Sequence, residues 1–99
     1  MKSIGELSPA LVWGIFEEIT RVPRPSKHEE KIIEYLVDFA KKHNLQHKVD
    51  GAGNVVIYKP ATPGYEAAPA VVLQSHSDMV CEKNAGVEHD FTKDPIRAV

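Results

Sequence analysis

The feature that most constrains the fold is a short apolar run, residues 70–74 (AVVLQ), which leads into the polar triplet His76-Ser77-Asp78. A nearly continuous apolar run of this length predicts a β-strand that is covered on both faces. Such a strand needs a layer of structure on each side. The chain has 99 residues, which is enough for one domain at most, or for a piece of one.

Composition argues against several classes of protein. The formal net charge of −2 gives no reason to expect binding to nucleic acid or to an anionic membrane. Cys81 is the only cysteine, so an intramolecular disulfide is impossible. No apolar run approaches the roughly 20 residues of a membrane span, and the N-terminal segment has no apolar core long enough for a signal peptide. We therefore expect a soluble cytoplasmic protein.

Two helices are predicted in the first half of the chain. Ser8 is expected to cap the first helix, with Pro9 at its first position, and Pro23 requires the helix to end before it. Ser26 and Glu29 have the spacing of a capping box, which predicts the start of the second helix. One apolar stripe at helical spacing follows: Ile32, Ile33, Leu36, Phe39 and Ala40.

A β-hairpin is predicted next, because β-branched and apolar residues at 45–50 and 54–60 flank the glycine-rich turn 51–53. Residues 61–69 have the composition of a surface loop, as does most of the chain after Asp78. The expected order is helix, helix, hairpin, buried strand and loop. The two helices can cover one face of the buried strand, but little chain remains to cover the other. We therefore expect the opening segment of a larger α/β domain.

His76 and Asp78 are the candidate functional residues. Positions i and i+2 of an extended chain point to the same side, so both side chains can face one space at the end of the strand. A neutral imidazole there is a good ligand for zinc or a similar divalent metal. Asp78 could be a ligand itself, or it could accept the other ring N–H and orient the imidazole. The ordinary alternative is a hydrogen-bonded histidine without function.

Three other histidines and the cysteine are expected to have no role at the site. We expect His28, His43 and His47 to interact locally or with solvent. His89 lies beyond the site strand in a loop that could approach the pocket, but its spacing fits no ligand motif, and we leave it unassigned. Cys81 has no flanking sequence typical of a thiol enzyme, and we expect it to be a small buried apolar residue.

Three stretches together resemble the N-terminal part of aminoacyl-histidine dipeptidases. They are residues 21–32 (RVPRPSKHEEKI), 50–60 (DGAGNVVIYKP) and 73–84 (LQSHSDMVCEKN). These dipeptidases are bacterial cytosolic metallopeptidases that cleave Xaa-His dipeptides such as carnosine. The resemblance covers most of the chain in the family's order.

The resemblance implies that residues 1–99 are the N-terminal portion of a mixed-sheet α/β zinc-peptidase catalytic domain, with two helices, a β-hairpin and a buried strand. It implies two divalent metal ions, usually zinc, with His76 as a ligand of one ion and Asp78 as the active-site residue that holds His76. The remaining ligands and the general base would lie beyond Val99, so the 99-residue chain alone would be inactive. The expected partners are a dipeptide substrate and a second copy of the protein, bound through a domain outside this chain. The alternative is a non-catalytic binding or interaction module that retains part of the peptidase fold.

Overall fold

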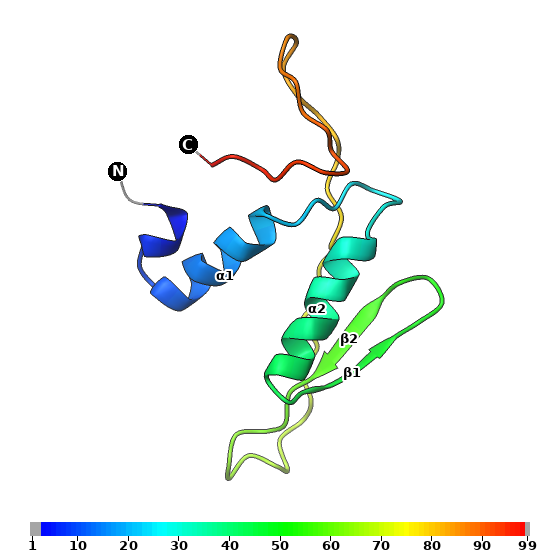
Figure 1. The fold of residues 1–99 in the computed structure, drawn as a ribbon. Coiled ribbons are helices and arrows are strands. Elements are labelled where there is room, and N and C mark those ends of the chain that lie inside the picture. The colour runs from blue at the N-terminus through cyan, green and yellow to red at the C-terminus, as the bar shows by residue number, and fades with distance from the viewer. Residues whose placement is uncertain (1–2, 99) are drawn as a thin grey trace.

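The computed structural model describes residues 3–98. Its elements, in chain order, are the short 3₁₀ helix η1 (Ile4–Glu6), the helices α1 (Ala10–Thr20) and α2 (Glu30–Lys42), and the strands β1 (Gln46–Val49) and β2 (Val55–Tyr58). Figure 1 shows the hairpin of β1 and β2 beside α2, with α1 on the other side. The expected α/β class, with two helices and a two-stranded antiparallel sheet, is confirmed. No helix between residues 3 and 98 is long and apolar enough to cross a membrane.

Helix α1 begins one residue later than the sequence predicts. Pro9 has an extended backbone, with φ −76° and ψ 133°, so it precedes the helix and Ser8 makes no cap. The helix ends before Pro23, as expected, and the Arg24 guanidinium donates to the carbonyl oxygen of Ile19 at 2.6 Å. This bond satisfies one of the carbonyl groups that every helix leaves free at its C-terminal end.

Helix α2 does not have the predicted capping box. It begins at Glu30, and the residue before it, Glu29, makes no side-chain cap. Residues 25–28 form a turn instead, in which His28 N–H donates to Pro25 O at 2.9 Å and Lys27 adopts a left-handed backbone with φ 73°. The prediction for Ser26 was wrong because its hydroxyl hydrogen-bonds to a distant part of the chain, described below.

Helix α2 contacts both strands of the hairpin and carries the buried apolar residues. Ile32 and Ala40 on the predicted apolar stripe are 2% and 0% exposed. The strands pair in antiparallel register with Val49 opposite Val55, which confirms the hairpin. At the turn, Gly53 has φ +87° and lies so close to Ile33 that a β-carbon would come within 3.0 Å of its side chain. A residue without a side chain is therefore needed where the turn meets the helix.

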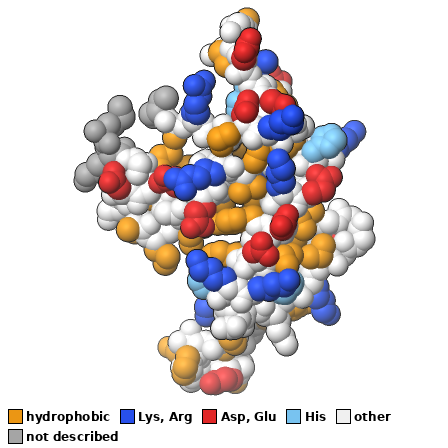
Figure 2. Space-filling model, in the orientation of Figure 1, with side chains coloured by type: hydrophobic (Ala, Val, Ile, Leu, Met, Phe, Trp, Pro, Cys, Tyr) orange, Lys and Arg blue, Asp and Glu red, His pale blue; other side chains and the backbone are white. Residues whose placement is uncertain are grey.

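The predicted buried strand at 70–74 is not formed. These residues run as an extended segment behind α2 in the view of Figure 1, and Leu73 is 92% exposed. A strand needs a hydrogen-bonded neighbour, and within residues 3–98 none pairs with residues 70–74. Other apolar side chains lie at the surface among charged groups on the face shown in Figure 2.

Candidate functional site

The site lies where the extended segment meets the turn before α2. Two backbone hydrogen bonds join these parts of the chain: Met79 N–H donates to Arg24 O at 2.9 Å, and Ser26 N–H donates to Met79 O at 3.2 Å. They form a single parallel bridge between Pro25 and Met79. Because Met79 is fixed in this way, the preceding residue, Asp78, lies against Ser26.

Three side chains form a hydrogen-bonded row at this bridge. His76 Nδ1 lies 2.9 Å from Asp78 Oδ1. The Ser26 hydroxyl donates to the other carboxylate oxygen, Asp78 Oδ2, at 2.5 Å. An ionised carboxylate can only accept hydrogen bonds, so the proton on the ring must sit on Nδ1. The predicted convergence of His76 and Asp78 on one side of the chain is therefore observed.

The electrostatics of the row favour an ionised carboxylate. The hydrogen bond from Ser26, and then the one from His76, hold the pKa of Asp78 below its ordinary value. A carboxylate that stays ionised remains an acceptor for Nδ1–H and keeps the imidazole in one tautomer. When the ring carries a single proton, that proton is on Nδ1 and the Nε2 lone pair is available.

His76 presents that nitrogen to solvent. Its side chain is 81% exposed, and within residues 3–98 Nε2 has no hydrogen-bond partner. A histidine held through Nδ1 by a carboxylate, with Nε2 free, is the arrangement commonly found around metal ions. Between residues 3 and 98, however, no group of three or more His, Cys, Asp or Glu side chains converges closely enough to hold a metal. The described chain therefore fits a metal site as the donor of one ligand.

Of the other histidines, His28 lies in the turn that contains Ser26, and the remaining three lie in other parts of the chain. His43 follows the end of α2 and packs on Phe39, with ring centroids 4.4 Å apart. His47 lies in β1, and His89 contacts Phe91 edge-on with ring centroids 4.8 Å apart. The expectation of a buried Cys81 was wrong, because this residue is exposed. It lies beyond the Met79 bridge, where no layer of the described chain covers it.

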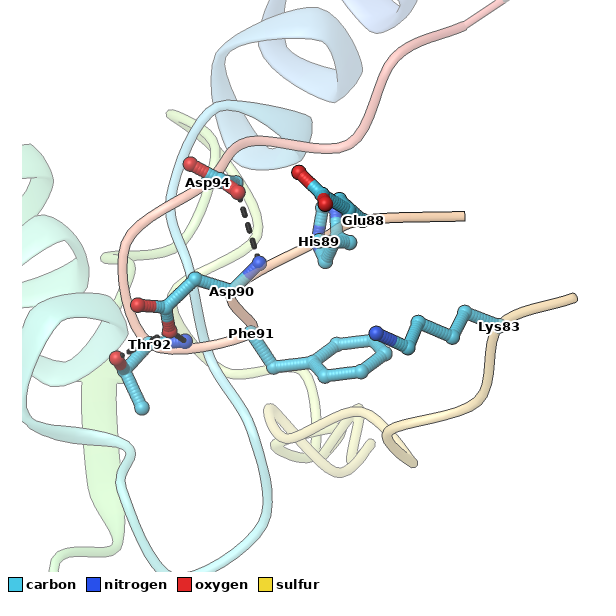
Figure 3. A pocket seen from close by; sticks show the side chains of 7 residues that line it. All are labelled: Lys83, Glu88, His89, Asp90, Phe91, Thr92 and Asp94. Carbon is cyan, nitrogen blue, oxygen red and sulfur yellow. Dashed lines mark hydrogen bonds between the residues drawn. The ribbon is translucent and has the colours of Figure 1, made fainter. Parts of the chain in front are cut away.

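An open hollow of about 760 Å³ lies in the C-terminal loop, apart from the row (Figure 3). Its polar groups mostly bond to one another: the Asp90 carboxylate accepts from the Thr92 N–H at 2.9 Å and the Thr92 hydroxyl at 2.6 Å, and Asp90 N–H donates to Asp94 at 2.8 Å. These bonds account for the shape of the loop. Neither His76 nor Asp78 lines the hollow, whose residues are Lys83, Glu88, His89, Asp90, Phe91, Thr92 and Asp94.

Ser26 is the member of the site that sequence reasoning missed. Its spacing to Glu29 is that of a helix cap, and no local pattern distinguishes a capping serine from one that contacts a residue 52 positions away. Its place in the first of the stretches that resemble known dipeptidases, residues 21–32, was the one available signal.

Comparison with known proteins shows which proteins this chain is similar to. No protein-family model matches the chain. The structure superimposes on part of a solved dipeptidase, the aminoacylhistidine dipeptidase from Vibrio alginolyticus, with a TM-score of 0.92 and 49% identity over 97% of this chain and 20% of that one. The sequence is 48% identical over 97 residues to the cytosol non-specific dipeptidase of Escherichia coli (strain K12), covering 98% of this chain and 20% of the relative.

The resemblance to aminoacyl-histidine dipeptidases is thereby confirmed in both sequence and structure. The chain spans about one fifth (20%) of the length of each of these relatives. The likeness thus applies to one segment of a dipeptidase.

Proposed function

We propose that the protein containing this chain is a metal-dependent dipeptidase in which His76 binds one metal ion through Nε2. The observation that carries the proposal is the 2.9 Å contact between His76 Nδ1 and Asp78 Oδ1, which leaves Nε2 exposed. The similarity to two dipeptidases supports the reaction class. We infer Xaa-His and similar dipeptides as substrates, because the names of the two relatives are aminoacylhistidine dipeptidase and non-specific dipeptidase.

The proposed cofactor is a pair of divalent ions, most simply zinc, which accepts imidazole nitrogen and carboxylate oxygen as ligands. When bound, the metal would polarise the scissile carbonyl and lower the pKa of a water molecule. A site with two ions needs several ligands for each ion. Residues 3–98 offer no converging group of three candidate ligands. We therefore propose that other parts of the full-length protein supply the remaining ligands and the general base.

Within this chain, each residue of the row has a separate task. His76 supplies the nitrogen ligand, and the Asp78 carboxylate accepts its Nδ1–H and so fixes which nitrogen is free. We assign Asp78 this orienting role, since its two oxygens already accept from His76 and Ser26. The name of the relative from Escherichia coli supports a cytoplasmic location, and a homodimer formed outside this segment remains part of the proposal.

The proposal is tested in the full-length protein by replacing His76 with alanine. His76→Ala should remove the metal from its site and nearly all hydrolysis of an Xaa-His dipeptide, measured by elemental analysis and by product release. His43→Ala is the matched control, because His43 lies at the far end of α2, roughly 20 Å from the start of the helix at 1.5 Å per residue. Undiminished metal content and turnover in His76→Ala would refute the assignment. An unmodified full-length protein that is folded but does not hydrolyse dipeptides would instead favour a binding module.

A further inference from the structure

Both oxygens of the Asp78 carboxylate have a hydrogen-bond partner, and the two partners come from different parts of the chain. Oδ1 lies 2.9 Å from His76 Nδ1, two residues away, and Oδ2 accepts from Ser26 Oγ at 2.5 Å. Rotation of a carboxylate about its last bond is only weakly restricted by the side chain itself. A partner at one oxygen alone would leave the carboxylate plane free to swing, whereas partners at both oxygens fix that plane.

The position of Ser26 does not depend on its hydroxyl. Its backbone N–H donates to Met79 O at 3.2 Å, and Met79 N–H donates to Arg24 O at 2.9 Å. The hydroxyl does not cap α2, whose preceding residue is Glu29. Its other contact, with Met79 O, is long at 3.3 Å. Removing the hydroxyl therefore takes one hydrogen bond from Asp78 and leaves the backbone bridge in place.

From this geometry we propose that Ser26 is a positioning residue of the site, which acts through Asp78 to keep the His76 proton on Nδ1 and Nε2 free. The proposal deepens the proposed function and rests on it for its catalytic consequence. Its structural part, the control of the His76 tautomer, concerns only residues of this chain and can be measured without metal.

The test compares four variants of the full-length, metal-free protein carrying ¹⁵N-labelled histidine. The ¹⁵N shifts of His76 report which ring nitrogen carries the proton, at a pH at which the ring is neutral. The unmodified protein should show the Nδ1–H tautomer. Ser26→Ala should shift the population toward the Nε2–H tautomer. Ser26→Thr, which keeps a hydroxyl, should show the Nδ1–H tautomer of the unmodified protein. Ser26→Cys keeps the size of the side chain but has a weak donor, so it should resemble Ser26→Ala. Ser75→Ala, an exposed serine in the same segment, should change nothing.

The metal-loaded variants supply the second measurement. We expect kcat of Ser26→Ala and Ser26→Cys to fall by about 10-fold, the lower end of the usual loss when a partner of a ligand is removed. KM should stay nearly constant, because Ser26 is proposed to act through Asp78 and to make no contact with the dipeptide. Ser26→Thr should recover most of the lost rate.

The outcomes separate the two proposals. Normal tautomer and kcat in Ser26→Ala and Ser26→Cys, together with an inactive His76→Ala, would overturn the role of Ser26 and leave the proposed function standing. A tautomer change in the two variants with full activity in His76→Ala would refute the proposed function and retain the positioning of His76 by Ser26. If Ser26→Ala loses its fold, Ser26→Cys decides: a normal tautomer there overturns the proposal. A Ser26→Thr protein that is folded yet as impaired as Ser26→Cys also overturns it.

Discussion

Ser26 and Asp78 are 52 positions apart in the sequence, yet the Ser26 hydroxyl lies 2.5 Å from Asp78 Oδ2. This contact joins the turn before α2 to the end of the extended segment, beside the backbone bridge at Met79. Asp78 in turn contacts His76, so the position of the exposed imidazole depends on a turn formed early in the chain. The turn before α2 thus contacts, through Asp78, the histidine that is proposed to bind the metal.

Asp78→Asn should lower activity without emptying the metal site. Asparagine has the size of aspartate but no negative charge, so the imidazole becomes a weaker donor of its lone pair. Metal affinity or turnover in the full-length protein should fall by ~10–100-fold, the usual cost of losing such a partner. Metal titration and dipeptide hydrolysis measure this. Asp38→Asn, on the exposed face of α2, is the control and should behave as the unmodified protein. Complete loss of one metal ion in Asp78→Asn would contradict an orienting role.

The hairpin turn should loosen in acid because of Asp50. Its carboxylate accepts from Ala52 N–H at 2.9 Å and from Asn54 N–H and the Asn54 side-chain amide, both at 2.8 Å. The bond from the Asn54 side chain, followed by the backbone bonds, lowers the pKa of Asp50 from its ordinary value of 3.8. The stabilisation is therefore complete above about pH 4 and is lost as the pH falls through the lower pKa of the folded state.

Amide exchange at Ala52 and Asn54 measures this effect. Exchange corrected for its intrinsic pH dependence should accelerate below about pH 4. Asp50→Ala should show fast exchange at these amides at every pH, since the acceptor is gone. Protection that stays constant down to the acid-unfolding point would show that the carboxylate does not hold the turn.

Ile32→Ala should destabilise the packing of α2 on the rest of the chain. Ile32 is 2% exposed, and truncation of a buried isoleucine to alanine costs about 2–5 kcal/mol in the free energy of unfolding. Chemical denaturation followed by circular dichroism measures the change. Glu34→Ala on the exposed side of the same helix should stay within ~0.5 kcal/mol. Equal free energies of unfolding for the two variants would show that Ile32 does not lie on the buried face of α2.

The phenol of Tyr35 should ionise at a higher pH than an ordinary tyrosine. Burial first, and then the hydrogen bond and negative charge of Glu18, raise its pKa from 10.0 to about 12. The phenol donates to Glu18 Oε2 at 2.7 Å. Because the folded pKa is raised, the stabilisation is present below pH 10 and is lost as the pH rises toward 12. Absorbance titration should show a step near pH 12 that Tyr35→Phe abolishes and Glu18→Gln moves to lower pH. A step that Glu18→Gln leaves in place would contradict the contribution of Glu18.

The elements that the sequence predicts correctly are those encoded locally. The apolar spacing of residues 30–42 and the glycine-rich turn at 51–53 each specify structure within a few neighbouring residues, and α2 and the hairpin are both confirmed. The contact between His76 and Asp78 was predictable for the same reason, because it follows from the two-residue repeat of an extended chain.

The elements that the sequence predicts wrongly depend on distant partners. The run at 70–74 is apolar enough for a covered strand, but a strand forms only beside another strand, and the described chain provides none there. Ser26 has the local pattern of a helix cap, and the competing bond to Asp78 decides its role. Both errors arise because residue spacing carries no information on whether a partner from a distant part of the chain is present.

The most direct test of the central claim is a crystal structure of the full-length protein with zinc bound. His76 Nε2 should lie about 2.0–2.1 Å from a zinc ion. At the same time, His76 Nδ1 should remain hydrogen-bonded to Asp78 Oδ1, and Ser26 should still donate to Asp78 Oδ2. Zinc bound without contact to His76, or an Asp78 oxygen within ~2.2 Å of the metal, would contradict the account.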